Sequence, residues 1–163
     1  DGVTGVAACA HSPGKIRALL ASAQEAGWGR VVAVFQPHRY SRTRDQGVEQ
    51  GLAVALADVV AVTDVYGAGE PALAGVSGLT VARAALEARP GATVAWTPTL
   101  DDALTWLRAT VRPGDLVLTI GAGDVYLVGP RLVAAGPRPA TERHPEPGPE
   151  PGPEPGPDGV GPA

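Results

Sequence analysis

Four nearly unbroken apolar runs constrain the fold of this chain more than any other feature. They are short and rich in β-branched residues, and they comprise residues 31–35, 59–62, 93–96 and 116–120. Strands with one solvent-facing side alternate apolar and polar residues, whereas continuous runs are typical of strands covered on both faces. Residues 3–9 form a weaker fifth candidate. The pattern predicts a parallel sheet buried between helices.

The segments between these runs change to the period of a helix. The first predicted helix begins at Ser12 and Pro13 and stops at Gly27, and the last carries a capping-box pattern from Thr99 to Asp102. Three stripes at helical spacing are Ile16, Leu19, Leu20 and Ala23; Val48, Leu52, Ala55 and Leu56; and Leu100, Ala103, Leu104, Leu107 and Val111.

Alternation of strand and helix five times predicts right-handed parallel βαβ units. The expected fold class is α/β: a doubly wound, Rossmann-like, mostly parallel sheet of five or six strands with helices on both faces. In such sheets ligands bind at the carboxyl ends of the strands, so the loops after each apolar run are the candidate site.

Composition divides the chain into a domain over 1–135 and a tail over 136–163. Ten of the 17 prolines lie between Pro137 and Pro162, among Pro-Glu-Pro-Gly repeats without large apolar residues. Such a segment buries too little surface to offset its ordering entropy, so we expect a disordered tail. The chain opens on Asp1 and contains no Met, which indicates a fragment of a longer polypeptide.

Charge and cysteine usage exclude several classes of function. Lys and Arg number 11 before residue 136, against 12 Asp and Glu, so a nucleic-acid or membrane-surface module is not expected. A lone Cys9, with no signal-peptide pattern, makes a cytoplasmic setting the expectation. His11, His38 and His144 lack metal-ligand spacing, so no metal site is expected.

The loop after the second predicted strand reads Gln-Pro-His-Arg-Tyr-Ser-Arg-Thr-Arg-Asp over residues 36–45. His38, Arg39, Arg42 and Arg44 fall within seven residues just before a helix start. Guanidinium groups match carboxylate or phosphate oxygens in pairs, and a helix N-terminus adds backbone donors. The loop is interpreted as an anion-binding site, with a solvated Arg-rich turn as the alternative.

Two Gly-rich loops, residues 64–71 and 121–124, each add an acid after a strand. Asp124 either contacts a ligand or caps a helix. A nicotinamide fingerprint fails because Tyr126 stands at the third glycine position, and no phosphate-binding loop of the Gly-Lys-Ser/Thr type is present. Ser41 beside His38 has no nucleophile-elbow context, so no catalytic residue is assigned.

Residues 34–45 resemble the signature of the bacterial UDP-N-acetylmuramate:L-alanine ligases, members of the Mur ligase family in peptidoglycan biosynthesis. The loops at 64–70 and 121–124 resemble later loops of that family in the same order. The similarity covers about residues 3–135 and corresponds to the C-terminal third of such an enzyme.

The resemblance implies an ATP- and magnesium-dependent enzyme that joins L-alanine to UDP-N-acetylmuramate through an acyl phosphate. This part would close on ATP together with missing N-terminal and central domains, and would be inactive and bind no cofactor by itself. Arg39 and Arg42 would hold the alanine carboxylate. His38, in the same motif, and His11 would line the substrate side of the cleft.

Residues 7–13 depart from the family pattern Asp-Asp-Tyr-Ala-His-His-Pro. They read Ala-Ala-Cys-Ala-His-Ser-Pro, so both acids, the Tyr and the second His are missing. The departure reflects either divergence of the ligase or an altered sequence near the chain start. The alternatives are a catalytically dead anion-binding or regulatory module, the domain of another Mur-type amino-acid ligase, and a dinucleotide-dependent oxidoreductase.

Overall fold

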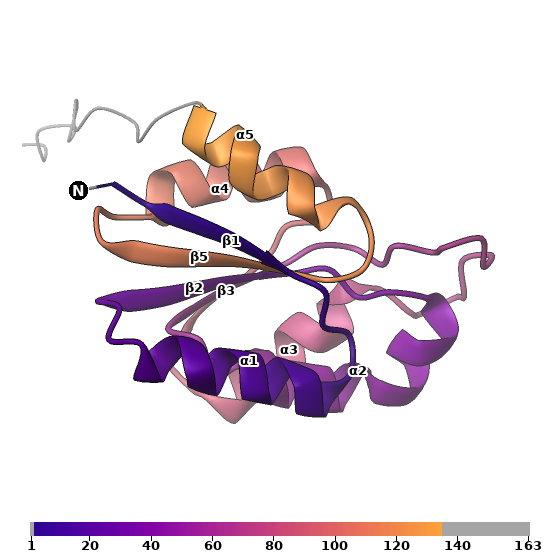
Figure 1. Ribbon diagram of the computed structural model, residues 1–163. Helices are drawn as coiled ribbons and strands as arrows, with labels where there is room; N and C mark the ends of the chain where they lie inside the picture. Colours follow the sequence, from indigo (N-terminus) through magenta and orange to yellow (C-terminus); the bar gives the residue numbers. More distant parts are fainter. Residues whose placement is uncertain (1, 135–163) are drawn as a thin grey trace, which may run out of the picture.

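The computed structural model describes residues 2–134, which form one sheet flanked by helices (Figure 1). The predicted tail over 136–163 lies outside the described residues. The elements are β1 (Thr4–Ala8), α1 (Pro13–Glu25), β2 (Arg30–Phe35), α2 (Tyr40–Val54), β3 (Val59–Val62), α3 (Gly78–Ala88), β4 (Thr93–Trp96), α4 (Leu100–Thr110), β5 (Asp115–Ile120), the 3₁₀ turn η1 (Asp124–Leu127) and α5 (Val128–Ala134).

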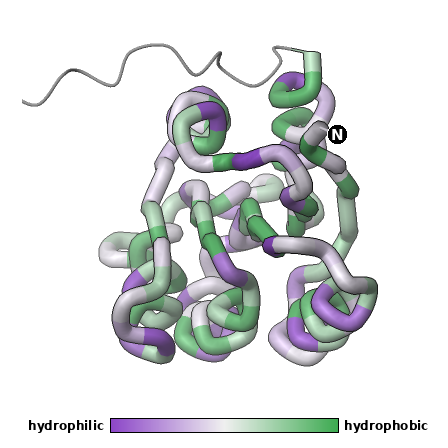
Figure 2. Tube along the Cα trace, turned by 90° about the vertical axis from the view of Figure 1, so that its left-hand side faces the viewer, coloured by the Kyte–Doolittle hydropathy of each residue, from purple (hydrophilic) through white to green (hydrophobic). Residues whose placement is uncertain are grey.

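The five strands run parallel in the order β1-β5-β2-β3-β4. Helices α1, α2 and α3 cover one face of the sheet, while α4 and α5 cover the other (Figure 1). Hydrophilic and hydrophobic residues alternate around the helices, as expected when one side of each faces a sheet (Figure 2). The predicted doubly wound α/β fold is confirmed.

Strands β2 and β5 each begin one residue earlier than their apolar runs indicated. Arg30 opens β2 and Asp115 opens β5, and the two residues are direct partners in the strand register. The Arg30 guanidinium donates to both carboxylate oxygens of Asp115, at 3.1 and 2.7 Å. Hydrophobic pattern alone misses these positions because the charges neutralise each other in a two-point ion pair at the amino edge of the sheet.

Strand burial follows the place of each strand in the sheet. β3 and β5 are fully buried and β2 is buried from Val31 onward, as their continuous apolar runs predicted. β1 lies at the sheet edge with four of its five residues exposed, including Val6. Its weaker pattern agrees with this edge position. β4 is the other edge strand and ends at the exposed Trp96, so its continuous apolar run wrongly predicted burial on both faces.

Helices α1 and α4 confirm the predicted starts and stops. α1 ends at Glu25, and Gly27 follows with φ +78°, the left-handed conformation that favours glycine after a helix. At the start of α4, the Thr99 hydroxyl accepts from the Asp102 N–H at 3.1 Å, and the Asp102 carboxylate accepts from the Thr99 N–H at 3.1 Å. The capping box is therefore formed in both directions.

Helix α2 corrects one prediction about which face is buried. Val48, Leu52 and Leu56 are 54%, 43% and 41% exposed, so most of the predicted apolar stripe faces outward. The buried side instead presents small and polar residues, because α3 packs closely against it. These residues are Thr43, Gly47, Gln50, Gly51, Ala53 and Val54.

Gly51 sets the closeness of the α2–α3 contact. A Cβ atom at this position would stand 2.5 Å from the Ala84 Cβ and 2.6 Å from the Val81 carbonyl oxygen. The sequence pattern did not indicate α3, since the buried side of this helix consists mostly of Gly and Ala rather than a bulky apolar stripe.

No helix among the described residues is long and apolar enough to cross a membrane.

Gly51→Ala is predicted to destabilise the protein. Alanine gains about 1 kcal/mol of helix propensity, but overpacking against α3 costs about 1 to 3 kcal/mol. Urea unfolding should show a lower midpoint with an unchanged slope. Gly14→Ala in α1 is the matched control, since nothing lies within 4 Å of its added Cβ, and it should leave stability unchanged or slightly higher. Equal effects of both substitutions would contradict the close contact.

Candidate functional site

The carboxyl ends of the parallel strands meet at one edge of the sheet, where the connecting loops gather (Figure 1). Because β5 lies between β1 and β2, the loop after β5 stands between the loops after β1 and β2. These three loops contain most of the residues singled out in the sequence. Parallel topology therefore assembles the candidate site from segments far apart in the chain.

Gln36, the first residue after β2, joins two of these loops. Its backbone N–H donates to the Ile120 carbonyl at 2.9 Å. Its side-chain amide donates to Asp124 at 2.7 Å and accepts from the Val125 N–H at 3.2 Å. Gln36 is only 6% exposed, so these bonds satisfy a buried amide and hold the start of η1 against β2.

The loops after β2 and β3 form a short parallel bridge. The Tyr66 N–H donates to the Pro37 carbonyl at 2.9 Å, and the Arg39 N–H donates to the Tyr66 carbonyl at 2.8 Å. The rings of His38 and Tyr66 stack with centroids 5.8 Å apart and an interplanar angle of 11°. Gly123 packs so closely on the Tyr66 ring that a Cβ would lie 2.5 Å from it.

Arg39 has an unusual backbone conformation for a residue with a side chain. Its φ is +71° and its ψ is 133°, just before the first turn of α2. Its carbonyl accepts from both the N–H and the hydroxyl of Thr43, at 3.0 and 2.9 Å. Surrounding hydrogen bonds thus maintain a strained backbone of the kind that gathers at binding sites.

The acids in these loops are each engaged in a structural contact. Glu70 accepts from the backbone N–H and the hydroxyl of Ser41, at 2.9 and 2.8 Å, and these bonds lower the Glu70 pKa. Asp64 accepts from the Gly78 N–H at 2.8 Å at the start of α3. With Asp124 bonded to Gln36, all three carboxylates fix loop ends, which supports the structural alternative for Asp124.

Two of the three arginines in residues 36–45 have no carboxylate partner among the described residues. Arg39 precedes α2, whereas Arg42 and Arg44 lie in its first turns and not before the helix start, as the sequence had indicated. Neither Arg39 nor Arg42 forms an ion pair within residues 2–134, whereas Arg44 pairs with Asp45 at 2.7 Å. An Arg42 guanidinium nitrogen lies 3.5 Å from Nδ1 of His38. Arg39 is exposed.

The four predicted binding residues form a connected electrostatic group. Burial, Arg42 and Arg39 lower the pKa of His38, as does His11. Burial, Arg42 and Lys15 likewise lower the pKa of His11. Both imidazoles are therefore held neutral beside the arginines, where they add hydrogen-bonding capacity without further positive charge. Their ligand-binding role stays a prediction.

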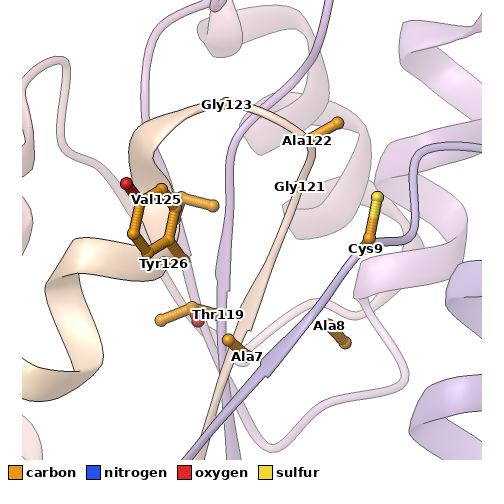
Figure 3. A pocket seen from close by; sticks show the side chains of 9 residues that line it. All are labelled: Ala7, Ala8, Cys9, Thr119, Gly121, Ala122, Gly123, Val125 and Tyr126. Atoms are coloured by element: carbon orange, nitrogen blue, oxygen red, sulfur yellow. The ribbon is translucent and has the colours of Figure 1, made fainter.

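A pocket of about 410 Å³ opens at the ends of β1 and β5. Figure 3 shows Tyr126 and Thr119 on one side of it and Cys9 on the other. Ala7 and Ala8 line the same space, so the segment that departs from the family pattern borders the pocket with small side chains.

Sequence reasoning did not single out Gln36, Tyr66 or Gln50. Gln36 and Gln50 are buried amides, and Gln50 donates to the main-chain carbonyl of His11 at 2.9 Å. The available signal was polarity at positions flanked by otherwise buried residues. That signal does not reveal which distant loop the amide contacts.

Comparison with known protein families identifies the family of this chain. The family described as Mur ligase, glutamate ligase domain, matches residues 1–123 of the chain. The chain belongs to this Mur ligase family. The resemblance to the Mur ligase family noted at residues 34–45 is thereby confirmed.

Curated relatives carry the name UDP-N-acetylmuramate–L-alanine ligase. The protein from Cutibacterium acnes is 49% identical over 126 residues, which cover 76% of this chain and 26% of that protein. The protein from Pelotomaculum thermopropionicum is 45% identical over 124 residues, covering 76% and 27% respectively. The Mur ligase domain described here thus spans about a quarter of the length of these relatives.

Solved structures show the same fold. The UDP-N-acetylmuramate–alanine ligase of Thermotoga maritima superposes with a TM-score of 0.63 at 27% identity, covering 82% of this chain and 26% of that one. A murein peptide ligase from Psychrobacter arcticus has a TM-score of 0.63 at 20% identity, covering 83% of this chain and 28% of that one, and shows likeness of fold alone.

Arg42→Ala is predicted to raise the pKa values of both His38 and His11 toward 6.5. Removing the guanidinium charge makes protonation of each imidazole less unfavourable, since Arg42 lowers both pKa values in the intact site. An NMR pH titration of the imidazole resonances measures the shifts. Arg44→Ala is the control, because Arg44 pairs with Asp45 and should leave both titrations in place. An unchanged pair of titrations in Arg42→Ala would contradict the cluster.

Glu70→Gln is predicted to reduce the loss of stability in acid. The Glu70 pKa lies below 4.5 in the fold, so its stabilising contribution is complete above the unfolded-state pKa and disappears as pH falls through the folded-state pKa. Thermal unfolding between pH 7 and 3 should therefore show a shallower decline in the variant than in the native chain. Glu49→Gln, an exposed change on α2, should retain the native decline.

Proposed function

We propose that this chain is the C-terminal domain of an ATP-dependent ligase that joins L-alanine to UDP-N-acetylmuramate in peptidoglycan synthesis. Two observations support the proposal: relatives of that name at 41 to 49% identity, and a strand-end site with cationic groups suited to a carboxylate. The remaining three quarters of such an enzyme would supply the UDP-sugar site and the phosphate loop.

The carboxylate of L-alanine is the group we assign to Arg39 and Arg42. Both lack an acidic partner within residues 2–134 and stand at the carboxyl edge of the sheet. A charge-assisted bond to a carboxylate would satisfy each guanidinium. His38 and His11, neutral beside them, would hydrogen-bond the ligand without repelling the arginines.

ATP and magnesium would act at a site assembled with the other domains. In the complete enzyme, ATP supplies the activation of the muramate carboxylate for amide formation. The described residues of this chain include no group of three His, Cys, Asp or Glu that would hold a metal ion. We therefore assign this domain amino-acid binding and closure over the nucleotide, and expect the isolated chain to be inactive.

A catalytically dead anion-binding module is the second candidate. The residues at the end of β1 favour it. Ala7, Ala8 and Cys9 line the pocket but contribute neither a carboxylate nor an aromatic ring to it. Such a module would keep the arginines and bind a small anion without supporting ligation.

A chimaeric enzyme separates these functions. This chain replaces the corresponding quarter of the Cutibacterium acnes ligase, and phosphate release is measured with UDP-N-acetylmuramate, ATP and L-alanine. Alanine-dependent turnover would support the ligase. The dead module would be favoured by two results together: the chimaera folds without turnover, and the isolated chain binds small carboxylates in calorimetry.

In an active chimaera, Arg39→Ala and Arg42→Ala are each predicted to raise the KM for alanine about ten- to hundredfold. Each substitution removes a charge-assisted contact of roughly 1.5 to 3 kcal/mol. Arg108→Ala, an exposed change on α4, is the control and should leave the KM unchanged. Unchanged alanine kinetics in both loop variants would make the assignment of the loop wrong.

A further inference from the structure

Gln50 is a fully buried polar residue on α2 beneath the loop that carries His11. Its side chain is 0% exposed, and its amide nitrogen donates to the main-chain carbonyl of His11 at 2.9 Å. Within residues 2–134, two buried side-chain atoms have no hydrogen-bond partner: Oε1 of Gln50 and Nδ1 of His11. They belong to the same two residues that this main-chain hydrogen bond joins.

The two unpaired atoms are chemically complementary. An amide oxygen only accepts hydrogen bonds, whereas an imidazole nitrogen donates when it carries the proton. Each buried polar atom left unpaired keeps the full cost of the hydrogen bonds to water that it has lost. The two atoms do not bond each other directly, but a proton on Nδ1 and one buried water between Nδ1 and Oε1 would satisfy both atoms together.

The orientation of the Gln50 amide is fixed by its other bond. Rotating the amide by half a turn would set its oxygen against the His11 carbonyl, placing two acceptors together and losing the 2.9 Å bond. Oε1 is therefore the amide atom that needs a donor. His11, whose main-chain carbonyl the same amide bonds, has the other unpaired buried atom, its ring nitrogen Nδ1.

We propose that Gln50 is a positioning residue that keeps the proton of neutral His11 on Nδ1. The lone pair then lies on Nε2, so His11 accepts a hydrogen bond from a ligand and does not donate one. The opposite tautomer would reverse this preference. The inference concerns this chain alone and does not require the proposed ligase activity.

Neighbouring charges make the tautomer the relevant state. Lys15 from α1 and Arg42 from α2 act on His11 from two elements, and its charge also couples to His38. With burial, Lys15 and Arg42 lower the His11 pKa, so the ring is neutral at physiological pH. For a neutral ring, the position of the single proton decides which ligand groups fit.

The test is ¹⁵N NMR of the imidazole rings in the intact chain above the histidine pKa range, with His11 assigned by a His11→Gln variant. The native chain should carry the His11 proton on Nδ1. Gln50→Leu should lose that preference, with the proton appearing on Nε2. Gln50→Glu keeps an acceptor, so it should restore the Nδ1 proton and raise the His11 pKa. Gln46→Leu, exposed on the same helix, should resemble the native chain.

A native His11 protonated on Nε2 would overturn the proposal, whatever the variants do. So would an unchanged Nδ1 proton in folded Gln50→Leu. If Gln50→Leu fails to fold, the native tautomer and the Gln50→Glu titration decide, since an unmoved His11 pKa in Gln50→Glu would exclude the contact. Alanine binding enters none of these readouts, so this inference and the ligase proposal fail separately.

Discussion

The candidate site depends on the buried amide of Gln36. The side-chain amide bonds Asp124 and Val125, the backbone N–H of Gln36 bonds Ile120, and together they fix the loop after β5 to the end of β2. Gly123 is thereby pressed against Tyr66, and Tyr66 in turn stacks with His38. A continuous series of contacts thus connects Gln36 to His38 at the start of the cationic loop.

Much of the fold follows from hydrophobic pattern, because burial on both faces leaves a continuous apolar run. The limits of this reasoning appear where other forces decide. Arg30 and Asp115 form an ion pair that extends β2 and β5 by one residue each. In the sequence, the same two charged residues indicate the end of an apolar run. On α2, bulky residues indicated the wrong face, because Gly51 permits a backbone approach that outweighs the larger side chains.

Residue type and local spacing singled out the candidate residues, whose binding role stays a prediction. His38 and Arg39 lie in the loop after β2, Arg42 lies in the first turn of α2, and topology brings His11 near them from the loop after β1. The sequence did not indicate Gln36 and Gln50, because the role of a buried glutamine depends on the distant groups with which its amide forms hydrogen bonds. For Gln50 the contact spans 39 positions in the chain, from α2 to the loop before α1.

The place of β5 has a consequence for how the chain acquires its structure. Among the strands of residues 2–134 it is synthesised last, yet it pairs with the first two. Its Leu116 is the partner of Thr4 in β1, and its Asp115 is the partner of Arg30 in β2. Pairings between such distant segments close long loops and form slowly. Both β1 and the inner edge of β2 therefore stay without this neighbour until nearly the whole domain has left the ribosome. This strand order therefore does not allow the sheet to be completed by adding strands one after another along the chain.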